Sequence, residues 1–161
     1  MSEYKQQEYD FVSRTKEIIN QYNSFPIPIN EKYETTLLIN CMVGLLIVPQ
    51  QYWFKKLPTE IISKEKWGFD KTNIKDNNKG YSIKEIAVHI RNCLAHYRYV
   101  IFSNEKKEIS HIIIEDYIDN AKTNKTFEAT ISIDSLRTFA DKLSSEFLKY
   151  MRTEKKINKK K

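Results

Sequence analysis

The sequence predicts a mainly α-helical fold with four main helices and one β-hairpin inserted before the last helix. Long stretches repeat apolar residues three and four positions apart, which is the pattern of amphipathic helices. Only residues 110–118 and 125–133 form a neighbouring pair of segments rich in β-branched residues, and a short polar stretch separates them. The length of 161 residues and the apolar content of 40% suit one globular domain. We therefore expect a single domain over residues 1–153.

The first two helices are predicted in the N-terminal third of the chain. Residues 3–23 carry an apolar stripe at helical spacing, and the prolines within 24–29 end it because proline disfavours helix in the residue before it. A second helix should run from about Asn30 to Val48, and its small polar face predicts the most buried helix of the fold. The apolar stretch 37–49 is too short to span a membrane, so we expect no membrane segment.

Three more elements are predicted after a long connection. Ser82, followed three residues later by a glutamate, has the capping-box pattern and opens a helix over residues 82–100. The β-hairpin comes next. The last helix should run from Ser132 or Asp134 to Met151, where another apolar stripe is found.

The connection over residues 49–80 shows no repeating pattern. We predict a surface segment with one short helical turn, and a connection of this length is uncommon unless it has a function. Lys55 and Lys56 follow the aromatic residues 52–54. The segment therefore either contacts nucleic acid or simply docks its aromatic side chains, and the sequence leaves both interpretations open.

Glycine content and charge exclude some functional classes. Only three glycines occur, and none forms a dinucleotide-binding turn, a phosphate-binding loop or a G-x-S-x-G nucleophile turn. The net charge of +6 includes +4 from residues 154–161, which hold five lysines and one glutamate, so +2 is left for residues 1–153. We expect 154–161 to be a basic, solvated and disordered tail.

The cysteines and the N-terminus predict a cytoplasmic protein. Cys41 and Cys93 lie in separate apolar stretches without C-x-x-C spacing, so we expect two reduced thiols. The charged N-terminus lacks the apolar core of a signal peptide. We expect no metal site and no cofactor, because no cluster of ligand residues has the required spacing.

The predicted helix 82–100 has two different faces. Its apolar face gathers Ile83, Ile86, Ala87, Ile90, Leu94 and Tyr97. The opposite face carries Val88, His89, Asn92, Ala95, His96 and Tyr99. Such a mixed face is typical of a cleft or a protein–protein contact. Arg91 flanks the apolar face, directly before Asn92 and five residues before His96.

The stretch IRNCLAH, residues 90–96, resembles the R-x4–6-H signature of the HEPN superfamily. Many members are metal-independent endoribonucleases of toxin–antitoxin and anti-phage systems, and Asn92 matches the polar residue that often follows the arginine. The stretch YETTLLINCMVGLLIVPQ (33–50) is similar to the central helix of short bacterial and plasmid-borne HEPN proteins, and SIDSLRTFADKL (132–143) after the hairpin also fits them. The resemblance implies a HEPN-like four-helix bundle and a homodimer in which both motifs meet. The hairpin departs from the minimal pattern.

These residue types suit RNA cleavage without a metal. The substrate's own 2′-hydroxyl can attack the adjacent phosphate while a histidine serves as base or acid. Arginine stays charged and presents a fork of donors to phosphate oxygens. This chemistry supports Arg91, Asn92 and His96 as the catalytic residues of a metal-independent endoribonuclease. The resemblance to the HEPN superfamily implies that the enzyme is of the toxin or anti-phage defence type. Further RNA contacts are predicted at Arg98, Lys55 and Lys56.

Other interpretations stay open at this point. The motif alone is a weak signal, and a HEPN-like dimer that binds RNA or a partner protein without cutting is the main alternative. A cognate antitoxin is a further possible partner. Arg98 also suits an ordinary salt bridge, and a Cys93–His96 hydrolase lacks a third group to orient the pair. The acidic residues near the hairpin turn are predicted to be solvated at the strand ends: Glu115, Asp116 and Asp119.

Overall fold

The computed structural model of the chain describes residues 4–28, 32–49, 51–106 and 108–158. It divides into two compact units, one made of residues 1–57 and 140–161 and the other of residues 58–139. Helices make up about 53% of the structure, and a four-stranded antiparallel sheet accompanies them. The prediction of a largely helical chain is confirmed, but the four-helix bundle is wrong, because the fold is mixed α/β.

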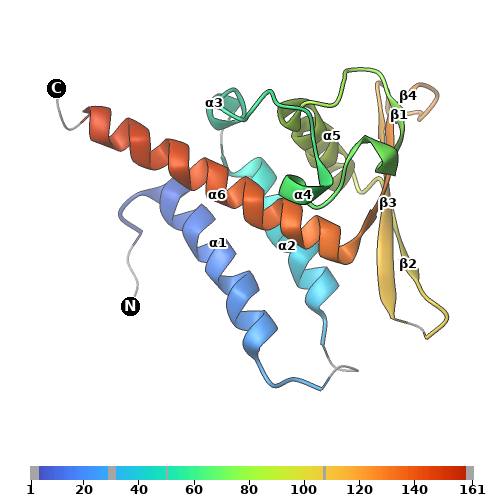
Figure 1. The fold of residues 1–161 in the computed structure, drawn as a ribbon, viewed down its shortest axis with the longest axis horizontal. Coiled ribbons are helices and arrows are strands. Elements are labelled where there is room, and N and C mark those ends of the chain that lie inside the picture. The colour runs from blue at the N-terminus through green and yellow to red at the C-terminus, as the bar shows by residue number, and fades with distance from the viewer. Residues whose placement is uncertain (1–3, 29–31, 50, 107, 159–161) are drawn as a thin grey trace. The chain divides into compact units, whose positions relative to one another are not determined.

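The first unit is helical within its described residues. Helices α1 (Gln7–Ser24) and α2 (Glu34–Ile47) lie side by side, and the short helix α3 (Gln51–Phe54) follows (Figure 1). Their contact is close, since a Cβ on Gly44 would lie 2.8 Å from Cζ of Phe11. Both helices agree with the predicted ones to within a few residues. None of the helices in the described segments is long and apolar enough to cross a membrane.

Helix α6 (Ile133–Asn158) begins in the second unit and continues into the first. Five residues of its predicted stripe are buried: Leu136, Phe139, Ala140, Leu143 and Phe147. Tyr150, the sixth predicted residue, is only half-buried. The helix extends beyond the predicted end at Met151, so residues 154–158 are helical rather than the start of a disordered tail. Residues 159–161 of the predicted tail lie outside the described residues.

The second unit is built on the sheet, whose strand order is β1-β4-β3-β2. The predicted hairpin is confirmed as β3 (Ile109–Tyr117) and β4 (Lys125–Ser132), which form the two central strands. Two edge strands were not predicted: β1 (Ile74–Asn77), from the long connection, and β2 (Tyr99–Ser103), from the end of the predicted helix 82–100. Helix α5 (Ile83–Ala95) packs against β3.

The remainder of the connection is ordered rather than a loose surface segment. It holds helix α4 (Lys64–Trp67) and a 3-10 turn at Lys71–Asn73. Trp67 and Phe69 are fully buried and pack on Phe139, with ring centroids 5.7 Å and 5.5 Å away. The aromatic side chains of this part of the connection therefore dock onto the domain.

Candidate active site

Helix α5 carries the motif, and both of its ends are well defined. At its start Ser82 and Glu85 form the predicted capping box, with the Glu85 amide donating to Ser82 Oγ over 3.3 Å. At its end the amides of Tyr97 and Arg98 donate to the carbonyls of Leu94 and Cys93 over 3.2 Å and 2.8 Å. This pair of bonds is a Schellman motif, which needs a residue in the left-handed region.

Tyr97 is that residue, with φ of 53°. A bulky side chain is uncommon there because its Cβ crowds the backbone, so the turn carries strain of about 1 kcal/mol or more. The prediction that Tyr97 belongs to the apolar face is wrong, since the helix ends at Ala95 and Tyr97 is 76% exposed. The other five residues predicted for that face are buried: Ile83, Ile86, Ala87, Ile90 and Leu94.

The three predicted catalytic residues lie at this end of α5. Arg91 and Asn92 are half-buried on the last full turn, while His96 is exposed and caps the helix. Arg91 Nη2 donates to Asn92 Oδ1 over 3.2 Å. The His96 amide donates to the Asn92 carbonyl over 3.0 Å, which ties the capping residue to the turn before it. The motif therefore has one partly covered side and one solvent-exposed histidine.

Asp116 of β3 is the charged group beneath this turn, and it is only 3% exposed. Its Oδ2 accepts from His89 Nδ1 over 2.9 Å and from Asn92 Nδ2 over 3.0 Å. Burial raises the pKa of Asp116, but the hydrogen bonds from His89 and Asn92 outweigh it and hold the pKa below its ordinary value. The group is therefore a carboxylate near neutral pH and acts only as an acceptor.

His89 belongs to the interior of the unit. It is fully buried, and its ring stacks on Phe127 with centroids 4.7 Å apart and an angle of 5° between the planes. Its Nε2 has no hydrogen-bond partner among the described residues. The interpretation of the mixed face as a cleft or a protein–protein contact is therefore wrong at His89, because the chain's own sheet covers that part of α5. The exposed remainder of the face is Ala95 and His96.

Arg98 is 8% exposed and makes structural contacts. Its guanidinium donates to Asp116 Oδ1 over 3.4 Å and to the carbonyls of Tyr117 and Asp119 over 3.3 Å and 3.2 Å. A fourth bond of 3.2 Å reaches Asn120 Oδ1. These contacts favour the salt-bridging role over contact with RNA, because a guanidinium with these partners has little room for a phosphate.

The two predicted lysines belong to the first unit, apart from the unit that holds the motif. Lys55 and Lys56 are exposed after α3. Lys56 forms an ion pair with Glu154 over 3.5 Å and lies 5.2 Å from the centroid of the Tyr52 ring. Both cations are therefore accessible, and one already has a carboxylate partner.

The remaining candidates of the sequence have structural roles. Burial raises the pKa of the Cys93 thiol, and the Asp116 carboxylate raises it further, which disfavours the thiolate that a cysteine hydrolase needs. Glu115 pairs with Lys125, and Asp119 accepts from the amides of Thr123 and Asn124 in the hairpin turn. No group of three or more His, Cys, Asp or Glu residues suited to a metal ion occurs in the described part of the chain.

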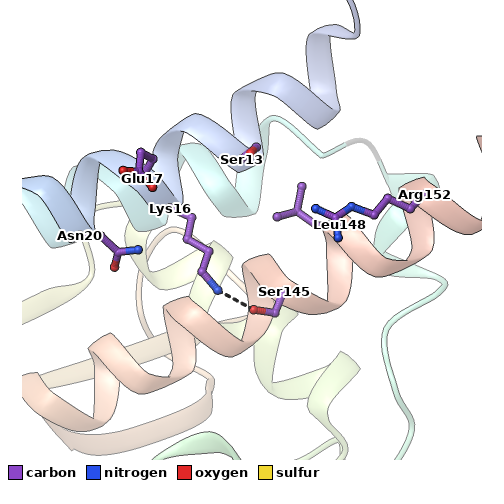
Figure 2. Close-up of a pocket in the computed structure, with 7 residues that line it drawn as sticks. All are labelled: Ser13, Lys16, Glu17, Asn20, Ser145, Leu148 and Arg152. Atoms are coloured by element: carbon purple, nitrogen blue, oxygen red, sulfur yellow. Dashed lines mark hydrogen bonds between the residues drawn. The ribbon is translucent and has the colours of Figure 1, made fainter.

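A separate pocket lies in the first unit between α1 and α6. Figure 2 shows Lys16 reaching across it to donate to the Ser145 hydroxyl over 2.8 Å. The pocket is lined by Ser13, Lys16, Glu17, Asn20, Ser145, Leu148 and Arg152. It contains no histidine, so it lacks the acid–base group that the motif supplies.

Sequence reasoning missed the roles of Asp116 and His89. The sequence predicts a solvated Asp116 at a strand end, yet the residue is buried on the face that it shares with Ile112 and Ile114. The signal was present, because side chains two residues apart on a strand point to the same face. An acid in phase with two buried isoleucines is expected to need buried donors.

Comparison with known proteins identifies the family to which the chain belongs. A search of curated proteins and a search of solved structures both found no significant match. The family model described as HEPN pEK499 p136 matches residues 1–154. A HEPN domain suggests a nuclease-like or RNA-related role, and the match covers α5 together with the strands that hold it. The chain therefore belongs to the HEPN pEK499 p136 family.

Proposed function

We infer that the protein is a metal-independent endoribonuclease that cleaves RNA through the 2′-hydroxyl. The observation that carries this proposal is the arrangement at the end of α5, where an exposed His96 follows a turn that holds Arg91 and Asn92 in contact. Family membership supports an RNA-related role. The proposed enzyme is of the toxin or anti-phage defence type, and its expected protein partner is an antitoxin.

The chemistry needs a base, an acid and a positive charge. A base removes the proton of the 2′-hydroxyl, the oxygen attacks the adjacent phosphorus, and an acid protonates the departing 5′-oxygen. The products are a 2′,3′-cyclic phosphate and a 5′-hydroxyl. In the dimer, His96 of one copy serves as the base and His96 of the other as the acid, and Arg91 stabilises the charge that develops on the phosphate. Asn92 orients Arg91 through their hydrogen bond.

The proposal includes a homodimer. HEPN domains commonly bind RNA and dimerise. Residues five apart on a helix are separated by about 140° around its axis, so Arg91 and His96 of one copy point in different directions. The proposed two-fold interface includes Asn92 and His96, so that the arginine of one copy can face the histidine of the other, and the exposed Tyr97 lies next to it in the chain. Light scattering should give about twice the chain mass of 19.2 kDa, and a monomer at micromolar concentration counts against the dimer.

Cleavage of single-stranded RNA in excess EDTA tests the activity. His96→Ala should lower the rate by about 10²–10⁴-fold because it removes the proton-transfer group. Arg91→Ala should cost a similar order. His111→Ala is the matched control, since His111 lies on β3, stacks on Phe102 and is outside the motif. If folded His96→Ala cleaves like the parent, the activity belongs to a contaminant or to other residues.

The alternative is a HEPN-like dimer that binds RNA or a partner protein without cutting. One observation favours it: Asn92 uses its amide nitrogen for Asp116 and its amide oxygen for Arg91, so part of the motif serves the fold. In that case the parent binds RNA without producing cyclic phosphate. Lys55→Ala and Lys56→Ala test the proposed RNA contacts, because removing one lysine–phosphate interaction should lower the salt slope of binding by roughly one.

A further inference from the structure

One buried carboxylate binds both sides of the motif. Asp116 Oδ2 accepts from Asn92, which lies within the last turn of α5, and Asp116 Oδ1 accepts from Arg98, which follows the helix end. His96 lies between these two anchored residues. The carboxylate also accepts from the amide of Tyr117 over 2.9 Å, so its own position on β3 is fixed by the backbone.

The orientation of Asn92 follows from its two partners. Its Nδ2 donates to a carboxylate oxygen of Asp116 at 3.0 Å, and a carboxylate cannot donate in return. Its Oδ1 therefore faces the Nη2 of Arg91, which donates over 3.2 Å. Reversing the amide would place oxygen against oxygen and nitrogen against guanidinium. Asp116 thus sets which side of the Asn92 amide meets the Arg91 guanidinium.

The position of His96 depends on the same group. The backbone turns sharply between His96 and Arg98, with Tyr97 in the left-handed region. A strained turn of this kind persists only when the flanking structure holds it. On one side the Asn92 carbonyl accepts from the His96 amide, and on the other the Arg98 guanidinium is bound to β3 and to the hairpin turn.

We propose that Asp116 is the positioning residue of this site: its buried carboxylate aligns Arg91 through Asn92 and holds the turn that carries His96 through Arg98. Asp116 has no contact with RNA in this role. The proposal rests on the proposed ribonuclease function for its kinetic consequence. Its structural consequence, the fixed orientation of Asn92, is independent of that function.

Asp116→Asn tests the proposal because it keeps the shape and removes the charge and one acceptor. The folded variant should lose about tenfold to 100-fold in kcat, as small displacements of catalytic groups do, with KM changed by less than about threefold. The matched control is Glu115→Gln, which alters the neighbouring carboxylate of β3, the partner of Lys125, and should cut like the parent. A parental kcat in folded Asp116→Asn overturns the proposal.

The double variant separates positioning from general damage. Because Asp116 acts partly through Asn92 and partly through Arg98, Asp116→Asn combined with Asn92→Ala should lose less rate than the product of the two single losses. Rate reductions that multiply would show that the two residues act independently and would overturn the proposal. If Asp116→Asn does not fold, Arg98→Lys replaces it: a fall in kcat at constant KM supports positioning, and a parental kcat overturns it.

Nuclear magnetic resonance keeps the test valid even for a parent that cuts no RNA. In the parent, the side-chain amide protons of Asn92 should exchange slowly with solvent, because Asp116 and Arg91 hold the group. In Asp116→Asn their exchange should accelerate by about tenfold or more. Unchanged exchange overturns the positioning role. Absence of His96-dependent cleavage in the parent refutes the ribonuclease function alone.

Discussion

Replacing Arg98 by alanine should destabilise the second unit far more than removal of an ordinary surface cation. Arg98 is 8% exposed and pairs with Asp116, which is 3% exposed. Breaking a buried ion pair by removing one partner typically costs about 3–5 kcal/mol. In this variant Asp116 still accepts hydrogen bonds from His89, Asn92 and the Tyr117 amide, so the remaining carboxylate is still partly compensated.

The lower end of that range is therefore expected. The other acceptors of Arg98 are the carbonyls of Tyr117 and Asp119 and the side chain of Asn120. The last two belong to the hairpin turn, where water can take the place of the guanidinium. We expect Arg98→Ala to lower the free energy of unfolding by about 3 kcal/mol. With a urea m-value of about 2 kcal/mol per molar, the midpoint should fall by about 1.5 M.

Urea unfolding followed by tryptophan fluorescence measures this change. The chain has two tryptophans, and Trp53→Phe leaves Trp67, which is fully buried in the same unit as Arg98. Lys75→Ala in that background is the control, because it removes a cation that is 79% exposed and pairs with Glu128 on the sheet, so it should cost under about 0.5 kcal/mol. Equal midpoints for the two variants would refute the stabilising role of the buried ion pair. The prediction that Arg98 contacts RNA would then be favoured again.

Three further outcomes follow from the same unit. Burial raises the pKa of Asp116, but hydrogen bonds outweigh it and hold the pKa below its ordinary value. The contribution of Asp116 to stability is therefore present above about pH 4 and is lost as the pH falls through the lowered pKa. Acid titration of unfolding should show this loss in the parent and not in Asp116→Asn. Ser82→Ala removes the cap of α5 and should cost about 1 kcal/mol, measured by thermal unfolding, whereas an unchanged midpoint would contradict the capping box. Cys93 should react with a thiol reagent only on unfolding, because burial raises its pKa, and fast labelling of the folded protein would disprove its burial.

Much of the fold was predictable because periodic burial leaves a direct mark on the sequence. The helical spacing within residues 3–23 and 30–48 corresponds to α1 and α2, and the β-branched segments correspond to β3 and β4. The capping pattern at Ser82 located the start of α5, since a side chain there must satisfy the free amides of the first turn. These features depend on local chemistry, which a single sequence records.

The end of α5 was missed because the usual signal is absent. Helices that close with a Schellman motif mostly place glycine in the left-handed position, and here that position holds Tyr97. An apolar aromatic at helical spacing therefore suggested a continued core stripe. The error also hid β2, since Tyr99–Ser103 was assigned in part to the helix. Tertiary contacts of Arg98 compensate for the strain, and no local pattern reports them.

The residues of the motif and the residue that positions them come from different parts of the chain. Arg91, Asn92 and His96 form a local pattern, so a motif search finds them. Asp116 contacts the motif only in the folded structure, where β3 packs against α5 and places the Asp116 carboxylate 3.0 Å from Asn92 Nδ2. Its burial could have been inferred from its phase with Ile112 and Ile114, but its partners depend on the pairing of helix and sheet. A chain that retains the motif and loses the acid at this strand position should therefore keep the signature while losing the alignment of Arg91.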